Sequence, residues 1–139
     1  MADYMLFVED NPRDVEITLD LLHQAGNRWE VIVLNDGESA LAFLERRGEF
    51  SSRREGSPRL ILLDIKMPRI SGLEVLRAIR DNPALGAIPV VLLTSSRQEQ
   101  DILAAYELKA DGYAIKPPKP AQLAATIESA IQAAAVRQG

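Results

Sequence analysis

Cysteine is absent from this 139-residue sequence, and histidine occurs once, as His23. Without cysteine there can be no disulfide, no thiolate metal site and no cysteine nucleophile. A single histidine cannot supply a histidine cluster for a metal, and any Ser-His-Asp triad would have to use His23. No carboxylate partner for His23 stands out, so we expect it to be a solvated helix residue.

Acidic residues outnumber basic ones, 20 against 16, and long apolar runs are absent. The formal net charge is −4, which argues against nucleic-acid binding, because that binding needs a basic face. The opening MADYMLFVED has neither the charged start nor the apolar length of a signal peptide, and no apolar run reaches the roughly 18 residues of a membrane span. These absences predict a cytoplasmic protein that binds neither nucleic acid nor membrane.

The apolar residues that are present predict one compact domain. They make up 47% of the sequence, enough to bury a core, and the length favours a single domain over residues 1–139 with no output domain. Five short apolar runs are expected to be strands: Tyr4–Val8, Val31–Leu34, Leu60–Leu63, Pro89–Leu93 and Gly112–Ile115. Most of them lack polar alternation, which is typical of parallel strands covered on both faces.

Helical patterns separate these runs. The i, i+3, i+4, i+7 spacing of a helix is kept by Val15, Thr18, Leu19 and Leu22, and later by Gly72, Val75, Leu76 and Ile79. The expected helix starts are Asn11 with Pro12, Ser71 with Glu74, Ser96 with Glu99, and Lys119 with Pro120. The result is a βα unit repeated five times, which predicts an α/β fold with a doubly wound parallel sheet of five strands.

Residues 46–59, RRGEFSSRREGSPR, interrupt this alternation of predicted strands and helices. The segment is rich in glycine, serine and arginine and has no periodicity, so we expect an extended surface loop. Its arginines are expected to be solvated, with a docking patch as the alternative. A domain boundary here would leave two fragments too small to bury cores of their own.

Polar residues follow four of the five predicted strands. The first strand leads into Glu9 and Asp10, the third into Asp64, the fourth into Thr94 and the fifth into Lys116. In open parallel sheets, ligands bind outside the carboxyl ends of the strands. Three carboxylates, one hydroxyl and one ammonium are therefore expected to converge on one edge of the sheet.

This combination of groups suits a hard cation and a phosphoryl group. Neighbouring carboxylates repel one another unless a cation joins them, and oxygen ligands without histidine or cysteine favour Mg²⁺. An aspartate beside that cation can attack phosphorus and form an acyl phosphate. A lysine and a threonine hydroxyl can then contact the phosphoryl oxygens that the metal does not reach.

These residues resemble the receiver family of response regulators in two-component signalling. The matching positions are Glu9, Asp10, Asp64, Thr94, Tyr113 and the Lys116–Pro117 dipeptide, together with the stretch LLDIKMPRISGLEVLRAIR. The similarity extends over roughly residues 3 to 132. It implies a flavodoxin-like (βα)5 fold with strand order 2-1-3-4-5, and a phospho-acceptor switch rather than an enzyme.

The resemblance also implies the role of each site residue. Asp64 is expected to be the phospho-acceptor, assisted by Thr94 and Lys116. One Mg²⁺ is expected on Asp10, Asp64 and the backbone carbonyl of Lys66, with Glu9 reached through water.

The same resemblance implies a switch and a set of partners. Thr94 and Tyr113 are expected to move after phosphorylation. The implied partners are a sensor histidine kinase, which in this family usually docks through the first helix, and a histidine phosphotransfer protein. A homodimer is expected through the face that carries Ile102, Leu103, Tyr106, Leu108 and the alanine-rich helix from Ala121 to Ala135.

The opening VEDNP, the loop before the third strand and the stretch IPVVLLTSSRQEQDILAAYELKADGYAIKP are similar to one subgroup. This subgroup comprises the stand-alone regulators paired with bacterial phytochromes and related histidine kinases. Two features depart from the common pattern. Lys66 stands where such proteins often carry a shorter polar residue, and Pro118 and Lys119 give an unusual KPPKP entry to the last helix.

Simpler interpretations of the same residues remain open. Glu9 and Asp10 could satisfy backbone donors at a helix entry, Thr94 could be a turn residue and Lys116 a solvated strand end. Tyr113 could serve only packing, and the alanines could reflect only helix propensity.

Three rival functions have specific requirements that the sequence does not meet. A phosphohydrolase with an aspartyl nucleophile usually places a second carboxylate two residues later, where this chain has Lys66. A flavin or nucleotide module needs a glycine-rich or hydroxyl-rich phosphate loop after the first strand, where this chain has Glu9, Asp10 and Asn11. A transcription factor would need a second domain.

Overall fold

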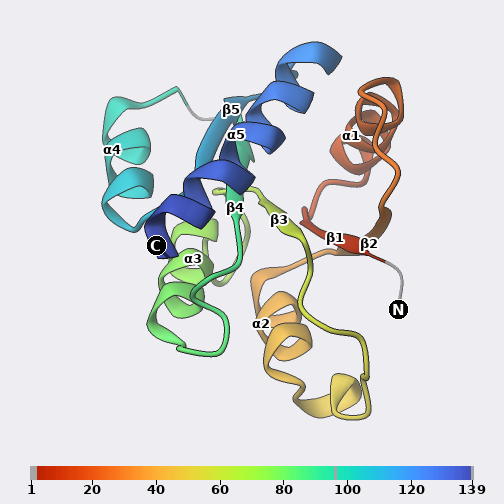
Figure 1. Cartoon of the computed structure of the whole chain (residues 1–139), viewed down its shortest axis with the longest axis vertical. Helices are drawn as coiled ribbons and strands as arrows, with labels where there is room; N and C mark the ends of the chain where they lie inside the picture. The colour runs from red at the N-terminus through yellow and green to blue at the C-terminus, as the bar shows by residue number, and fades with distance from the viewer. Residues whose placement is uncertain (1–2, 96, 139) are drawn as a thin grey trace.

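The computed structural model describes residues 3–95 and 97–138, and it contains one parallel sheet (Figure 1). The strands are β1 (Tyr4–Val8), β2 (Glu30–Leu34), β3 (Leu60–Leu63), β4 (Val90–Thr94) and β5 (Gly112–Ile115). Their order is β2-β1-β3-β4-β5, and every neighbouring pair is parallel. The predicted α/β class and strand order are confirmed.

Helices cover both faces of this sheet. They are α1 (Pro12–Gln24), α2 (Gly37–Glu45), α3 (Gly72–Asp81), α4 (Glu99–Glu107) and α5 (Pro120–Gln138). Met5 and Phe7 of β1 belong to one core with residues of α1 and α5, while Leu6 and Val8 belong to the other with residues of α2, α3 and α4. Burial on both faces explains why the strands are apolar without alternation. No helix among the described residues is long and apolar enough to cross a membrane.

The helix starts follow the sequence signals with one exception. Asn11 accepts hydrogen bonds from the first turn of α1, and Ser71 with Glu74 forms the expected capping box of α3. The predicted box of Ser96 with Glu99 is wrong in its register, because α4 begins at Glu99 with Gln98 at the cap position and no side-chain cap bond. Ser96 itself lies outside the described residues.

The segment 46–59 is more ordered than a purely solvated loop. It includes a short 3₁₀ helix, η1 (Gly48–Phe50), whose Phe50 packs on the core. The Arg53 side chain is only 6% exposed and lies 3.9 Å above the ring of Phe43. It donates hydrogen bonds to the Phe43 carbonyl and the Tyr4 hydroxyl. The expectation of solvated arginines is therefore wrong for Arg53, although the other arginines of the segment are exposed.

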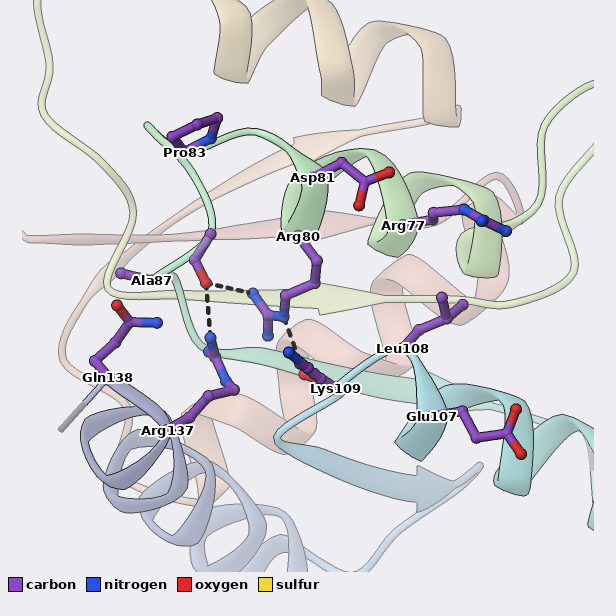
Figure 2. Close-up of a pocket in the computed structure, with 11 residues that line it drawn as sticks. Arg77, Arg80, Asp81, Pro83, Ala87, Glu107, Leu108, Lys109, Arg137 and Gln138 are labelled. Carbon is purple, nitrogen blue, oxygen red and sulfur yellow. Dashed lines mark hydrogen bonds between the residues drawn. The ribbon is translucent and has the colours of Figure 1, made fainter.

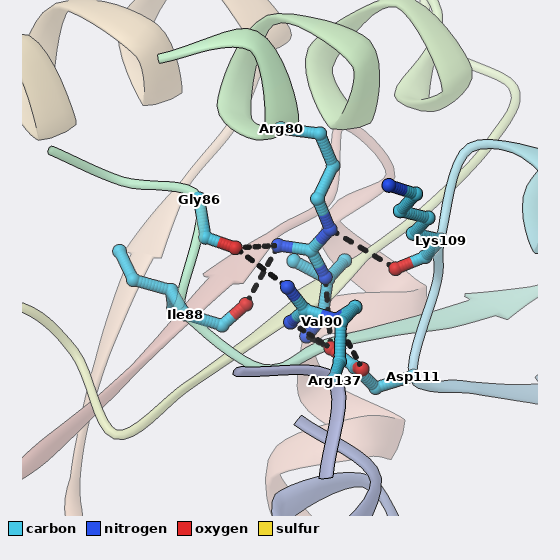
Figure 3. A network of polar contacts seen from close by, with 7 residues as sticks. All are labelled: Arg80, Gly86, Ile88, Val90, Lys109, Asp111 and Arg137. Atoms are coloured by element: carbon cyan, nitrogen blue, oxygen red, sulfur yellow. Dashed lines mark hydrogen bonds and ion pairs between the residues drawn. The ribbon is translucent and has the colours of Figure 1, made fainter. Parts of the chain in front are cut away.

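A buried ionic network joins the helices at the amino ends of the strands (Figure 3). Arg80 of α3 and Arg137 of α5 both donate to the carboxylate of Asp111, which precedes β5. A pocket of about 590 Å³ lies beside this network, and the exposed Asp81 is on its rim (Figure 2). Because all strands are parallel, the network and the pocket lie at the opposite end of the sheet from Glu9 and Asp64.

Candidate functional site

Three carboxylates meet where β1 and β3 end. Val8 and Leu63 are paired across the two strands, so the residues that follow them emerge side by side. One carboxylate oxygen from each of Glu9, Asp10 and Asp64 lies within 4.8 Å of the others. Glu9 and Asp64 are buried, while Asp10 is exposed. The convergence expected from strand order is therefore present, with one carboxylate open to solvent.

Lys116 reaches this group from the end of β5. Its backbone N–H donates to the carbonyl of Thr94, which extends the pairing of β5 with β4 by one bond. Its Nζ lies 2.5 Å from Glu9 Oε1, 2.9 Å from Asp14 Oδ2 and 3.4 Å from Asp64 Oδ2. The peptide bond between Lys116 and Pro117 is cis. One ammonium thus stands among three carboxylates.

The close packing of these charges shifts their pKa values. Burial raises the pKa of Glu9 to about 7, aided by the neighbouring charge of Asp64 and opposed by the hydrogen bond from Lys116. Burial alone would lower the pKa of Lys116, but its hydrogen bonds to Glu9 and Asp14 outweigh burial and raise it. Lys116 therefore stays charged at neutral pH, and its charge holds the pKa of Glu9 below the value that burial alone would give.

Among the described residues, one oxygen of Asp64 has no hydrogen-bond partner. Its Oδ2 is near Lys116, but its Oδ1 is buried and has no hydrogen-bond partner among the described residues. A buried carboxylate oxygen without a partner is costly unless a cation or a donor reaches it. The oxygen-only donor set and this oxygen together fit a hard divalent cation such as Mg²⁺.

The chain after Asp64 packs tightly against the start of α3. The backbone N–H of Gly72 donates to the carbonyl of Ile65 at 2.7 Å. A Cβ atom at position 72 would lie only 2.0 Å from the carbonyl oxygen of Asp64. Glycine is therefore required here for close approach, and α3 supports the backbone that carries Asp64.

The remaining predicted site residues lie around this centre. Thr94 is buried at the carboxyl end of β4, between the strands that carry Asp64 and Lys116. Tyr113 is half-buried on β5 and packs against the core under α2, α3 and α4. Lys66 is exposed, two residues beyond Asp64. The structure thus places Thr94 at the same sheet edge and Tyr113 within the adjoining edge strand.

The prediction from sequence missed Asp14. This residue lies in the first turn of α1, and its Oδ2 is 2.9 Å from Lys116 Nζ. The sequence did carry a signal for it. Asp14 lies in the first turn of the helix that follows Glu9 and Asp10, so its side chain is expected near the same edge of the sheet. What the sequence could not supply was the partner, which is 102 positions away.

Comparison with known proteins agrees with this geometry. Residues 5–128 match the model of the response regulator receiver domain. The chain is 44% identical to response regulator Rcp1 of Synechocystis over 114 residues, which cover 81% of this chain and 75% of Rcp1. A structure of Rcp1 in its Mn(2+)-bound form is similar with a TM-score of 0.76 at 38% identity, over 91% of this chain and 89% of Rcp1.

Two further solved structures are similar over most of their length. The bacteriophytochrome response regulator RtBRR has a TM-score of 0.85 at 45% identity, covering 94% of this chain and 78% of RtBRR. The phosphorylated cyanobacterial phytochrome response regulator RcpA has a TM-score of 0.78 at 34% identity, covering 92% of this chain and 90% of RcpA. With the family model matching most of its length, this chain belongs to the response regulator receiver family.

Proposed function

We propose that this protein is a phospho-acceptor switch in which Asp64 receives a phosphoryl group from a histidine kinase. The observation that carries the proposal is the buried Oδ1 of Asp64, which has no hydrogen-bond partner among the described residues. The same carboxylate lies close to Asp10 and to Lys116. In the transfer, a carboxylate oxygen of Asp64 forms a bond to phosphorus while the bond from phosphorus to the imidazole nitrogen breaks. The electron pair stays on that nitrogen, and the ring leaves as neutral imidazole when its other nitrogen carries a proton. Membership of the family and the phosphorylated form of RcpA support this assignment.

The phosphoryl group brings nearly two negative charges into this site. Lys116, at 3.4 Å from Asp64, is a cation placed to meet them, and Thr94 lies at the neighbouring strand end. Apart from this acceptor chemistry and the hydrolysis of its own acyl phosphate, we propose no enzymatic activity. The chemistry consists of accepting and losing a phosphoryl group.

The acceptor assignment predicts that Asp64→Asn abolishes labelling by a phosphorylated kinase or by acetyl phosphate with Mg²⁺. The amide keeps the size of the side chain but is a far weaker nucleophile than the carboxylate. The measurement is incorporation of radioactive phosphate, with Asp81→Asn as a matched control that removes an exposed carboxylate far from the site. Acid-labile phosphate persisting on Asp64→Asn would show that another residue is the acceptor.

We propose that Mg²⁺ is the metal of this site, held by Asp10, Asp64 and the backbone carbonyl of Lys66, with Glu9 reached through water. The metal would neutralise the charge of the transferred phosphoryl group. We expect Asp10→Asn to weaken Mg²⁺ binding at least about tenfold, because one or two carboxylates supply most of the affinity of such sites. Titration calorimetry measures this, and an unchanged dissociation constant would remove Asp10 from the ligand set.

The partners follow from the family rather than from the geometry. We propose a sensor histidine kinase, of the phytochrome type in view of the similarity to RtBRR and Rcp1. The kinase is expected to dock through α1, and a histidine phosphotransfer protein is a further acceptor for the phosphoryl group. A cytoplasmic site of action without nucleic-acid or membrane binding agrees with the net charge of −4.

We propose that the switch consists of Thr94 and Tyr113 and that it controls a homodimer through α4, β5 and α5. After phosphorylation Thr94 would donate a hydrogen bond to the phosphoryl group, and Tyr113 would turn into the space that Thr94 leaves. β5 is an edge strand, and the adjoining α4 exposes about half of the surface of Leu103 and Tyr106. An open edge beside apolar side chains favours a two-fold contact.

For the dimer we expect a shift toward monomer in Tyr106→Arg, because the guanidinium would meet its own copy or apolar side chains across the two-fold axis. Thr94→Ala should keep labelling at Asp64 but lose the increase in dimer on phosphorylation. Sedimentation at tens of micromolar, with and without a phosphoryl mimic, measures both effects. A wild type that stays monomeric under both conditions would rule out the dimer.

A further inference from the structure

Asp14 is the carboxylate of this site that lies outside the acidic cluster of Glu9, Asp10 and Asp64. It is held in the first turn of α1, where its backbone N–H donates to the capping Asn11 side chain at 3.4 Å. From there its Oδ2 accepts a hydrogen bond from Lys116 Nζ at 2.9 Å. Asp14 therefore fixes the ammonium from the side of α1.

The two carboxylates that accept hydrogen bonds from Lys116 differ in how easily they can release it. Glu9 has a side chain with no exposed surface, and its second oxygen accepts from the Asn11 backbone at 3.2 Å. Asp14 has a side chain that is 32% exposed. A buried carboxylate that loses its cation is left uncompensated, whereas a partly exposed one is rehydrated by water at little cost. Of the two, Asp14 is thus the carboxylate that can lose its hydrogen bond to Lys116 at the lower cost.

A phosphoryl group on Asp64 would need the same ammonium. Lys116 has three donor hydrogens, and its two shortest contacts are already with Glu9 and Asp14. Asp14 Oδ2 and Asp64 Oδ2 lie 2.9 Å and 3.4 Å from the same Nζ, so the two carboxylates are close to each other. Asp14 therefore adds a negative charge beside the place where the phosphoryl group arrives.

Building on the proposed acceptor function, we propose that Asp14 is a positioning residue that restrains Lys116 and competes with the phosphoryl group on Asp64 for its ammonium. In the unphosphorylated protein, Asp14 holds Lys116 on the α1 side of the site. Phosphorylation draws the ammonium away, and Asp14 is released to solvent. The residue thereby lowers the rate at which Asp64 accepts a phosphoryl group.

The rate of labelling by acetyl phosphate with Mg²⁺ tests this restraint. We expect Asp14→Asn to raise the rate constant for labelling of Asp64 about threefold to tenfold, because a negative charge close to the acceptor carboxylate is removed and Lys116 is freed. Asp14→Glu keeps the charge and should behave like the wild type. Glu16→Gln is the matched control, since it removes the same charge from an exposed position of α1, and its rate should stay close to that of the wild type.

A thermal unfolding cycle without metal tests the contact itself. Asp14→Asn should lower the melting temperature more in the wild type than in the Lys116→Met background, since only the wild type has the ion pair to lose. An equal effect in both backgrounds would mean that Asp14 acts only on its helix, and would overturn the proposal. If the wild type is labelled and Asp14→Asn is labelled at the same rate or more slowly, the proposal is also overturned. A wild type that takes no label would overturn the acceptor function and this inference together.

Discussion

Gly72→Ala is expected to destabilise the protein by about 3 kcal/mol, near the upper end of what overpacking a core costs. The added Cβ would lie 2.0 Å from the carbonyl oxygen of Asp64 and 2.9 Å from the Cα of Ile65. Both neighbours are backbone atoms, so no side-chain rotation can relieve the contact. The start of α3 would have to move away, and the hydrogen bond from Gly72 to Ile65 would lengthen or break.

Gly72→Ala also has contributions that stabilise the folded protein. In a helix, replacing glycine by alanine gains about 1 kcal/mol in propensity, and it also reduces the entropy of the unfolded chain. We expect the clash to outweigh both gains. Urea unfolding measures the free energy, and labelling should also slow because the backbone of Asp64 is displaced.

Gly56→Ala is the matched control for this substitution. A Cβ at Gly56 would meet no atom within 4 Å, so its free energy of unfolding should change by no more than about 0.5 kcal/mol. If Gly72→Ala were as stable as Gly56→Ala and were labelled at the wild-type rate, the close approach of α3 to the acceptor segment would not be needed.

The sequence could predict the carboxylate cluster because it depends on topology alone. Parallel strands bring their carboxyl ends to one edge, so Glu9, Asp10, Asp64 and Lys116 could be placed together once the strands were recognised. The strands themselves were recognisable because both of their faces are buried, which leaves short apolar runs. The fold and the centre of the site therefore follow from local patterns and one rule of connection.

Residues whose role depends on a distant partner could not be predicted in this way. Arg53 belongs to a segment with the composition of a solvated loop, yet its burial is set by the ring of Phe43 and by acceptors from other segments. Asp14 resembles an ordinary first-turn carboxylate until Lys116 is placed beside it. The start of α4 at Glu99 also escaped prediction, because the serine signal at position 96 does not fix its register.

Asp111 shows the same dependence on distant partners, and its replacement by alanine is expected to cost about 3–5 kcal/mol of stability, as when one member of a buried ion pair is removed. Its side chain is 3% exposed, and its carboxylate accepts hydrogen bonds from Arg80, Arg137 and the backbone N–H of Val90 (Figure 3). Removing the Asp111 carboxylate would take a shared, buried acceptor away from two guanidinium groups and one backbone N–H. Burial and the neighbouring Arg137 already lower the pKa of Arg80, while Asp111 opposes that shift.

The loss of stability should depend on which residue of the network is replaced. Arg137→Ala leaves Arg80 and Asp111 as a one-to-one pair, so it should cost less than Asp111→Ala, whose loss leaves two cations facing each other. Asp81→Ala removes an exposed carboxylate from the rim of the adjacent pocket and should change stability by no more than about 0.5 kcal/mol (Figure 2). Urea unfolding of the three variants gives the ranking. Similar stabilities for Asp111→Ala and Asp81→Ala would mean that the network does not join α3, β5 and α5 in solution, and that α5 is held by its apolar contacts alone.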